Sequence, residues 1–362
     1  MVEWKKLGEI CDVFAGGDLP NHYIKTNKPT AEYQYPIYSN GIGEKSLYGY
    51  SDSYRVNETS ITISARGTIG YHTIRDPHFT PIVRLITLIP KKIDSVNLSY
   101  LNEVLYMTNI DGTKGGIPQL TVPVVSKITV PVPSLEEQNR IVGILDTFTT
   151  SIDNLKEQIA QRRKQYEYYR DQLLDLEGKE GVEKRVLKEV CEVINGRAYS
   201  QPELLDKGKY RVLRVGNFFS NDSWYYSDLE LEDKYYCNKG DLLYAWSASF
   251  GPHIWEEEKV IYHYHIWKMN CKEALDTKYM YYWLQSEDMK KQAFSNLHGA
   301  TMAHLTKVLM ESLKVPVPSL SEQQRIVDIL DKFEASIQNL EAQLSQREKQ
   351  YEYYRNKLLT FE

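Results

Sequence analysis

Several polar residues in the second half of this 362-residue sequence have the types and spacing that metal chemistry uses. Asp241, followed by Glu257-Glu258-Lys259, matches the D…E-x-K spacing of metal-dependent nucleases, in which two carboxylates hold Mg²⁺ and a lysine polarises the attacking water. However, residues 256–258 are also typical of a charged turn between two strands, and such triples arise easily by chance. We therefore expect no nuclease activity from this chain.

Three histidines form a second candidate for metal chemistry. His263 and His265 share one face of a predicted strand, with His253 nearby, so the imidazoles could bind a metal ion. Histidines that pack in a core, or that face a ligand such as DNA, are more common than metal ligands. The four cysteines include no C-x-x-C pair, which fits a reducing cytoplasm better than disulfides or a zinc site. We expect no metal on this chain.

Glycine-rich segments give no clear cofactor site. Phe14-Ala-Gly-Gly-Asp18 superficially resembles a cofactor loop, but its glycine spacing fails and no convincing buried strand precedes it, so we interpret it as a turn. The sequence contains no G-x-x-x-x-G-K-[ST] loop for binding nucleotide phosphates. These features predict a chain that is not an enzyme and carries no cofactor of its own.

Composition leaves the ligand open. The formal net charge is −5, and the acidic excess lies mainly in residues 131–177 and 316–362, whereas residues 1–130 and 178–315 are close to neutral. No apolar run is long enough for a membrane helix, and the charged N-terminus argues against a secretory signal, so we expect a cytoplasmic protein. The 28 tyrosines are typical either of a recognition surface or of a tyrosine-rich core.

An internal repeat organises the chain. Val130-Pro-Val-Pro-Ser-Leu-Glu-Glu-Gln-Asn-Arg-Ile-Val recurs as Val315-Pro-Val-Pro-Ser-Leu-Ser-Glu-Gln-Gln-Arg-Ile-Val, and the offset of 185 holds to the end of the chain. A shorter echo relates Leu7-Gly-Glu-Ile-Cys-Asp-Val to Leu187-Lys-Glu-Val-Cys-Glu-Val. Cys11 and Cys191 are therefore expected to be equivalent core positions. The sequence predicts two copies of a unit, each a mixed domain followed by a long helix.

Each repeated segment predicts a long helix with a coiled-coil seam. The prolines disfavour an earlier start, and Ser134 with Glu137, like Ser319 with Glu322, forms an S-x-x-E capping box. Apolar residues then follow in alternating steps of four and three, which is the spacing of a coiled coil. Each helix would be about 65 Å long, and Gly178 would end the first. The predicted seams are Ile141, Leu145, Phe148, Ile152, Leu155, Ile159 and Arg162, and then Ile326, Leu330, Phe333, Ile337, Leu340, Leu344 and Arg347.

Arg162 and Arg347 interrupt the two apolar stripes at equivalent positions. Either each arginine extends from the seam edge to a nearby glutamate, or each fixes the register of the helix pair, because an offset pairing would leave a buried charge. The periodicity alone does not choose between parallel and antiparallel pairing.

The two mixed domains, residues 1–130 and 178–315, contain short β-like runs at residues 60–64, 82–89, 240–246 and 260–267. One helix per domain is predicted, at residues 98–109 and 277–296. Ser64-Ala-Arg-Gly-Thr-Ile-Gly70 occupies the place of Ala245-Trp-Ser-Ala-Ser-Phe-Gly251. The common skeleton with different loop residues is what two readers of different sites would need.

The sequence resembles the specificity subunits of type I restriction–modification enzymes over its whole length, on the basis of the duplicated V-P-V-P-S-L-x-E-Q-x-R-I-V segment ahead of long helices. The resemblance implies an α+β fold with two target recognition domains that each read one half of a bipartite, asymmetric site in double-stranded DNA. It implies that the helices set the spacing and dock two modification subunits, which use S-adenosylmethionine. Restriction subunits would add ATP- and Mg-dependent translocation and cleavage. The N-P-P-Y-like tetrapeptide of an adenine methyltransferase is absent from this chain.

DNA as the ligand favours an antiparallel helix pair. Two similar readers approach a duplex through a two-fold axis perpendicular to it, and that operation reverses a helix lying along the DNA. The same relation predicts that Glu362 ends near Met1. The competing interpretation is a coiled-coil scaffold with two protein-binding domains and no role on DNA.

No motif carries base contacts over to named positions, so we select loop donors and acceptors, since arginine pairs well with guanine and glutamine with adenine. An ordinary turn or solvent-exposed role is the alternative for each. The candidates are Ser64, Arg66, Thr68, Lys114 and Gln119 in the first domain, and Arg197, Trp246, Ser247, Ser249, His253, Thr301 and His304 in the second.

Overall fold

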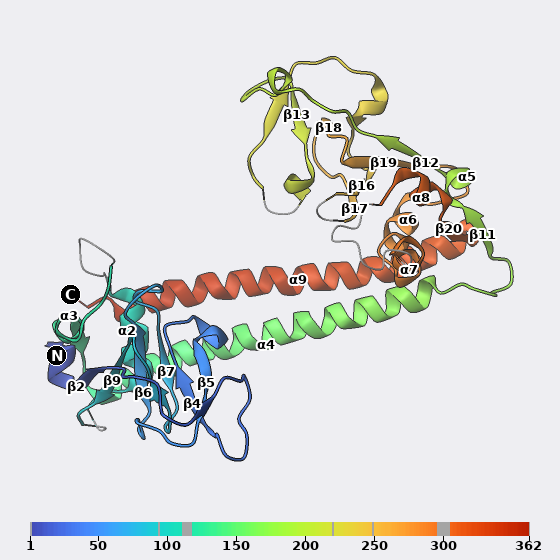
Figure 1. Cartoon of the computed structure of the whole chain (residues 1–362). Helices are drawn as coiled ribbons and strands as arrows, with labels where there is room; N and C mark the ends of the chain where they lie inside the picture. Colours follow the sequence, from blue (N-terminus) through green and yellow to red (C-terminus); the bar gives the residue numbers. More distant parts are fainter. Residues whose placement is uncertain are drawn as a thin grey trace. The chain divides into compact units, whose positions relative to one another are not determined.

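The computed structural model describes residues 2–92, 95–110, 118–218, 221–247, 250–294 and 305–361, and the chain divides into two compact units (Figure 1). The first unit comprises Met1–Leu155 and Gln343–Glu362, and the second comprises Lys156–Ala342. Each contains one mixed domain and parts of two long helices, α4 (Leu135–Leu174) and α9 (Leu320–Leu359). The predicted α+β class, with two similar mixed domains and two long helices, is confirmed.

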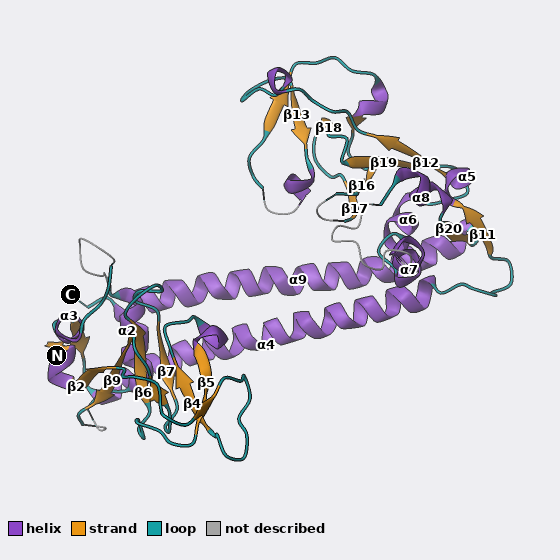
Figure 2. Cartoon of the chain, in the orientation of Figure 1, coloured by secondary structure: helices purple, strands orange, loops and turns teal. Residues whose placement is uncertain are grey.

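The first domain is built from two four-stranded sheets and a short two-stranded one (Figure 2). One sheet has the order β2 (Cys11–Ala15), β9 (Leu85–Pro90), β6 (Ser60–Ser64), β7 (His72–Arg75). The other has the order β3 (Tyr23–Ile24), β5 (Leu47–Ser51), β4 (Tyr35–Tyr38), β8 (Thr80–Pro81). The third pairs β1 (Glu3–Lys6) with β10 (Thr129–Val132). The helices are α1 (Leu7–Ile10), α2 (Leu98–Met107) and α3 (Val122–Ser126), with one 3-10 turn, η1 (Gly43–Ser46).

The second domain repeats this plan with one change. Its main sheet has the order β12 (Cys191–Asn195), β19 (Ile266–Cys271), β16 (Leu242–Ala245), β17 (Gly251–Ile254). The second sheet has the order β14 (Tyr225–Ser227), β13 (Tyr210–Leu213), β18 (Val260–Tyr262), β15 (Tyr236–Cys237), and β11 (Glu183–Val186) pairs with β20 (Lys314–Val317). The helices are α5 (Leu187–Val190), α6 (Thr277–Trp283), α7 (Glu287–Phe294) and α8 (Lys307–Ser312), and the 3-10 turns are η2 (Gln201–Glu203), η3 (Val215–Phe218) and η4 (Asp233–Tyr235). The second sheet of each domain contains one parallel pair, β4 with β8 in the first domain and β13 with β18 in the second. The change is in the added outer strand: β3 pairs with β5 in the first domain, whereas β15 pairs with β18 in the second.

The repeated Val-Pro-Val-Pro-Ser segment fastens each long helix to its domain. The Tyr100 hydroxyl donates to the Pro131 carbonyl at 3.0 Å, and the Tyr279 hydroxyl donates to the Pro316 carbonyl at 2.9 Å. Gln138 is fully buried; its amide donates to the carbonyls of Pro133 and Ser95 and accepts the N–H of Asn97.

Gln323 makes the equivalent contacts in the second unit. It donates to the carbonyls of Pro318 and Ala274 and accepts the N–H of Asp276, at the start of α6. The glutamine of the repeat therefore joins three backbone segments in each unit, and its removal would leave buried backbone groups without partners.

Each long helix begins with half of the predicted capping box. The hydroxyl oxygens of Ser134 and Ser319 accept the N–H groups of Glu137 and Glu322, both at 3.3 Å. The second half of the prediction was wrong, because the Glu137 carboxylate pairs with Arg140 at 2.6 Å instead of returning to the serine N–H. Glu322 pairs with Arg325 at 2.7 Å in the same way. An exposed ion pair one turn along the helix replaces the reciprocal bond.

The helices run antiparallel within each unit. In the first unit the Phe148 ring stacks on Tyr354 with centroids 5.2 Å apart, and the Arg347 guanidinium lies 5.7 Å from the same ring. In the second unit Phe333 stacks on Tyr169 at 5.4 Å, and Arg162 lies 6.0 Å from it. Each phenylalanine is therefore held between an arginine and a tyrosine of the other helix. The first alternative for Arg162 and Arg347 was a contact with a nearby glutamate. In the structure each arginine instead lies beside a phenylalanine ring of the other helix.

The predicted seam positions are all buried or half-buried. At one end of each seam the residues join a domain core, because Ile141 and Leu145 pack with Leu7 and Leu88, and Ile326 and Leu330 pack with Leu187. Buried positions are Ile141, Leu145, Ile152, Leu155, Ile159, Ile326 and Leu330; half-buried positions are Phe148, Arg162, Phe333, Ile337, Leu340, Leu344 and Arg347.

Three predicted elements differ from the structure. The run at residues 260–267 is two strands, β18 and β19, separated by a turn in which the Ile266 N–H donates to the His263 carbonyl at 2.9 Å. The run at residues 82–89 likewise begins with a turn. The helix predicted over residues 277–296 is split into α6 and α7, because the Ser286 hydroxyl accepts the Met289 N–H and starts a new helix.

Met1 and Glu362, which were predicted to lie close together, fall outside the described residues. Their neighbours belong to one core, since Phe361 packs against the cluster that contains Leu7.

Candidate nucleic-acid interface

Both domains build the same backbone turn at the start of a central strand. We call residues 82–84, before β9, and residues 263–265, before β19, the recognition turns. The Val83 N–H donates to the Gly17 carbonyl at 2.9 Å, and the Tyr264 N–H donates to the Arg197 carbonyl at 3.0 Å. Each turn also accepts a bond from the residue that follows the neighbouring strand: Ala65 N–H to Arg84 O at 2.8 Å, and Trp246 N–H to His265 O at 3.2 Å. Equivalent backbone hydrogen bonds thus hold both recognition turns.

A glycine is required beneath each recognition turn. A Cβ at Gly16 would lie 2.2 Å from the Ile82 carbonyl oxygen, and a Cβ at Gly196 would lie 2.3 Å from the His263 carbonyl oxygen. Close packing against the Ile82 carbonyl leaves no room for a side chain at Gly16, which accounts for this glycine of the Phe14-Ala-Gly-Gly-Asp18 segment. The glycine pair directly follows β2 and lies against the recognition turn, so the segment has a structural role.

In the first domain the predicted candidates divide into exposed and buried residues. Arg66 is half-buried and Gln119 is exposed, and both lie beside Ala65, whose carbonyl accepts the Leu120 N–H at 2.8 Å. The Thr68 hydroxyl donates to the Asn40 carbonyl, so it holds the loop. Ser64 is fully buried as the last residue of β6, which removes its hydroxyl from the surface. Lys114 lies outside the described residues.

In the second domain the equivalent surface is aromatic. Trp246 stacks on Trp267 at 5.7 Å and its indole N–H donates to the Tyr264 carbonyl at 2.9 Å. Tyr264 is exposed, and His265 lies edge-on to Trp246 at 5.1 Å. Ser247 follows Trp246 and is half-buried. Ser249, Thr301 and His304 lie outside the described residues.

Arg197 occupies the position of Gly17 and is already paired. Its guanidinium contacts Glu203 at 2.6 Å and lies 5.1 Å from the Tyr199 ring. This ion pair raises the pKa of Arg197 and lowers the pKa of Glu203 to about 2. A base contact by Arg197 would require it to leave this carboxylate.

Burial favours the neutral form of two histidines of the second domain, His253 and His263. Burial lowers the pKa of His263 to about 4, with a smaller contribution from His265 beside it. Burial also lowers the pKa of His253. Neutral imidazoles can donate or accept hydrogen bonds but do not attract phosphate by charge.

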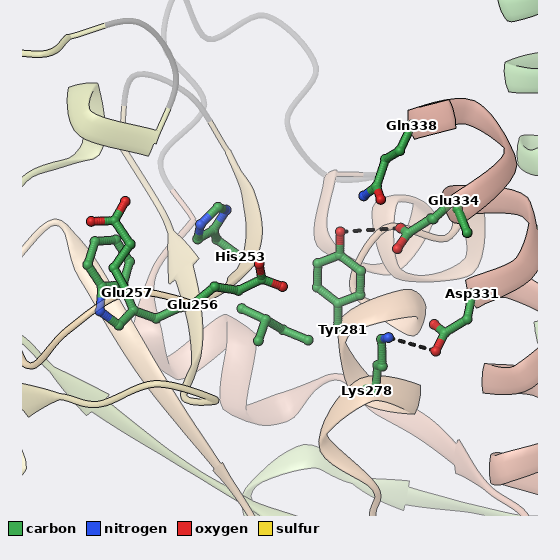
Figure 3. Close-up of a pocket in the computed structure, with 11 residues that line it drawn as sticks. His253, Glu256, Glu257, Lys278, Tyr281, Asp331, Glu334 and Gln338 are labelled. Carbon is green, nitrogen blue, oxygen red and sulfur yellow. Dashed lines mark hydrogen bonds and ion pairs between the residues drawn. The ribbon is translucent and has the colours of Figure 1, made fainter. Parts of the chain in front are cut away.

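His253 lines an acidic pocket of about 650 Å³ within the second unit (Figure 3). Lys278 pairs there with Asp331 at 2.7 Å, and the Tyr281 hydroxyl donates to Glu334 at 3.4 Å. Burial raises the pKa of Glu334. The carboxylates outnumber the one lysine, which is unfavourable for a phosphate backbone and argues against a DNA contact by His253. The lining is His253, Ile254, Trp255, Glu256, Glu257, Lys278, Tyr281, Asp331, Glu334, Ala335 and Gln338.

The nuclease-like residues do not assemble. Asp241 accepts the Asn238 N–H at 2.8 Å, whereas Glu257 pairs with Arg211 at 2.8 Å in an exposed turn before β18. Within the described ranges no group of three or more His, Cys, Asp or Glu side chains could hold a metal ion. The same residues include no helix that is both long and apolar enough to span a bilayer.

Cys11 and Cys191 are buried at the first positions of β2 and β12, as predicted from the short echo. Burial raises the pKa of Cys11 to about 12, and a side-chain hydrogen bond with Cys271, together with burial, raises the pKa of Cys191. These thiols are therefore unreactive core groups.

The chain contains two copies of a unit, each with a recognition turn and a long helix. A family model matches both copies. The model described as type I restriction modification DNA specificity domain matches residues 1–162 and again residues 179–348. This chain belongs to that family. The duplicated match corresponds to the internal repeat.

Individual relatives agree with the family assignment. A putative type I specificity subunit of Mycoplasma pneumoniae is 36% identical over 173 residues, which cover 46% of this chain and 47% of the relative. The chain thus spans about half the length of that relative. A putative type I restriction enzyme specificity subunit of Haemophilus influenzae is 30% identical over 385 residues, covering 99% of this chain and 96% of the relative.

A solved structure shows the same fold. The crystal structure of a type I restriction–modification system S subunit from M. genitalium matches with a TM-score of 0.60 at 17% identity, covering 100% of this chain and 97% of that one.

Three residues at or beside the recognition turns, Arg55, Arg84 and Tyr264, were not among the predicted candidates. Arg84 and Tyr264 were placed inside predicted strands, where they are turn residues in the structure. A signal was present, because a polar residue interrupts the apolar run at Arg84 and again at the equivalent His265. No sequence pattern marks Arg55 as a residue of this site. Its place is known from the structure, in which its guanidinium group lies against Gly17.

Proposed function

We propose that this chain is the DNA-recognition subunit of a type I restriction–modification complex, with each domain reading one half of a bipartite, asymmetric site. The observation that carries the proposal is the pair of recognition turns: equivalent hydrogen bonds hold both turns, while the exposed side chains include Val83 and Arg84 in one and Tyr264 in the other. Direct readout of two different sequences needs this combination.

The chain itself supplies no catalytic group in this proposal. S-adenosylmethionine would bind to modification subunits that methylate adenine, and ATP and Mg²⁺ to restriction subunits. The complex would act on DNA in the cytoplasm of a bacterial or archaeal cell. The scaffold alternative explains the helices but gives no reason for the differing side chains on the recognition turns.

The helices would dock two copies of the modification subunit. Tyr168 is 61% exposed and packs edge-on against Tyr169 at 5.3 Å; Tyr353 is 59% exposed and packs against Tyr354 at the same distance. The inner tyrosine of each pair is held by the phenylalanine of the other helix. Two exposed aromatic groups with the same supports fit two copies of one partner.

Native mass measurements test this docking. Tyr168→Ala and Tyr353→Ala should each leave a complex with one modification subunit, and the double variant should leave none. Two subunits retained by the double variant would move the docking surface elsewhere on the chain.

Methylation mapping in cells tests the reading function. DNA from cells that express this chain with its modification subunit should carry N6-methyladenine in a split, non-palindromic motif, and the motif should vanish when this chain is deleted. A complex that assembles without methylating DNA would favour the scaffold alternative.

The spacing role has a separate test. One heptad inserted between Leu155 and Ile159, and another between Leu340 and Leu344, preserves the seam and should lengthen the gap between half-sites. An unchanged gap would reject the idea that the helices set the spacing.

A further inference from the structure

Arg84 has an unusual backbone conformation at the first recognition turn. Its φ of 77° is in the left-handed region, which among the described non-glycine residues only His78 shares. Residues other than glycine adopt this region at a cost, and such positions concentrate where a side chain has a functional role. The equivalent His265 does not have a positive φ. The first turn therefore accepts strain that the second avoids.

Two further arginines meet Arg84 at this turn. Arg66 follows Ala65, whose N–H donates to the Arg84 carbonyl at 2.8 Å. Arg55 Nη1 lies so close to Gly17 that a Cβ there would be 2.5 Å away, and Gly17 is bonded to Val83. We call Arg55, Arg66 and Arg84 the arginine cluster.

The arginine cluster has no carboxylate partner among the described ion pairs of the structure. The other arginine of this domain behaves differently: Arg75 donates to Thr62 and Ser46 and lies 3.8 Å from the Tyr38 ring centroid. Arg197, beside the second turn, is neutralised by Glu203. Three exposed or half-buried guanidinium groups without an internal role therefore gather at one turn of the first domain.

The geometry points to Arg84, supported by Arg66, as the residue that selects a guanine in the first half-site. This inference rests on the proposed function. A bidentate contact to guanine O6 and N7 needs a planar fork held at a defined place, whereas a phosphate contact tolerates a mobile point charge. A turn fixed by hydrogen bonds on both sides, with a strained residue at its end, provides a defined place. Exposed Gln119 precedes Leu120, whose N–H donates to the Ala65 carbonyl, and adds an adenine-reading group nearby.

Arg84→Gly is the most informative variant, because glycine adopts φ 77° without strain and the turn keeps its backbone. Arg84→Lys keeps the charge but loses the fork. Lys127→Ala removes an exposed charge at the C-terminal end of α3 and serves as the control. Each full-length variant would be assembled with its modification subunit, and binding would be measured against DNA with every single-base substitution in both half-sites.

The wild-type complex should discriminate against replacement of one G·C pair in the first half-site by about tenfold or more. Arg84→Gly and Arg84→Lys should both lose that discrimination at the same position, leave the second half-site unchanged and keep the fold. Lys127→Ala should resemble the wild type.

Two results would overturn the inference while leaving the proposed function intact. One is a specific wild-type complex whose first half-site contains no G·C pair. The other is a uniform loss of affinity by Arg84→Gly with base preferences unchanged, which would make Arg84 a phosphate contact. A wild-type complex without any sequence preference would instead reject the proposed function itself.

Discussion

The two recognition domains share a backbone and differ in what lies between their sheets. In the first, Thr62 faces Thr87 across β6 and β9, and Ser60, Ser64 and Thr87 have buried hydroxyls without a described hydrogen-bond partner. In the second, Leu243 and Lys268 occupy the register of the threonine pair, and Trp255 joins an apolar core. One interior is rich in hydroxyl groups and the other in aromatic rings, yet both recognition turns keep the same hydrogen bonds.

The contrast shows which features define the fold. Backbone bonds at the turns, the glycines beneath them and the glutamines at the helix starts are duplicated. The side chains at the surface, and even those between the sheets, are not duplicated in the two domains. A scaffold held by backbone contacts leaves the surface side chains free to differ between the two domains, which the proposed reading of two different half-sites requires.

The largest expected effect comes from the glycines that both domains require. Gly16→Ala and Gly196→Ala should each destabilise their own domain by about 3 kcal/mol, the upper part of the range for overpacking, because the new Cβ meets a backbone carbonyl that cannot rotate away. Thermal unfolding followed by circular dichroism measures it. Gly143→Ala, on a helix with no atom within 4 Å of the new Cβ, is the control. A neutral Gly196→Ala would mean that the two turns are not equivalent.

The buried glutamines should matter equally in both units. Gln138→Ala or Gln323→Ala leaves two carbonyls and one N–H without partners, which costs about 1–3 kcal/mol. Chemical unfolding of the two variants would give the losses. A large loss for one and none for the other would break the equivalence of the helix attachments.

The arginine–phenylalanine contacts sharpen the comparison of the helices. Arg162→Met and Arg347→Met keep the aliphatic stem, and each should cost about 0.5–1 kcal/mol from loss of the cation–π contact. Unfolding free energies at two salt concentrations measure the effect. If Arg163→Met, whose arginine forms an exposed pair with Glu341, costs as much, the stacking on phenylalanine has no special role.

The smallest expected effect is on the pH dependence of stability and involves the carboxyl groups of Glu103 and Glu334, which lie on different elements of the two units. The Tyr351 hydroxyl donates to Glu103 on α2 at 2.8 Å, whereas its equivalent Tyr166 donates to Glu334 on α9 at 3.2 Å. Burial raises the pKa of both carboxyl groups above 4.5, so their contribution to stability is fully present at acidic pH and is lost as pH rises through the raised pKa.

Glu103→Gln and Glu334→Gln should each flatten this fall in stability between pH 4.5 and 7, by less than about 1 kcal/mol. Stability measured across that range would show it. A steeper fall in the variants would reverse the assigned sign.

The sequence predicted the repeat-based architecture well because a constant offset, proline pairs and alternating apolar steps are local signals. It failed at residues 263–265 because Tyr264 and the flanking apolar residues continue the pattern of a strand, and only the carbonyl of His263 accepting the Ile266 N–H reveals the turn. Ser64 was selected as a loop donor, but it is the last residue of β6, where every side chain is buried. Arg55 reaches the turn through tertiary packing that no local pattern encodes.

The most direct test of two readers on one backbone plan is a chain in which residues 181–315 replace residues 1–130. Expressed with its modification subunit, this chain should methylate a palindromic motif made of two copies of the second half-site, with the spacing close to that of the wild type. A motif that still contains the first half-site, or a folded and assembled complex that methylates no symmetric sequence, would contradict the account.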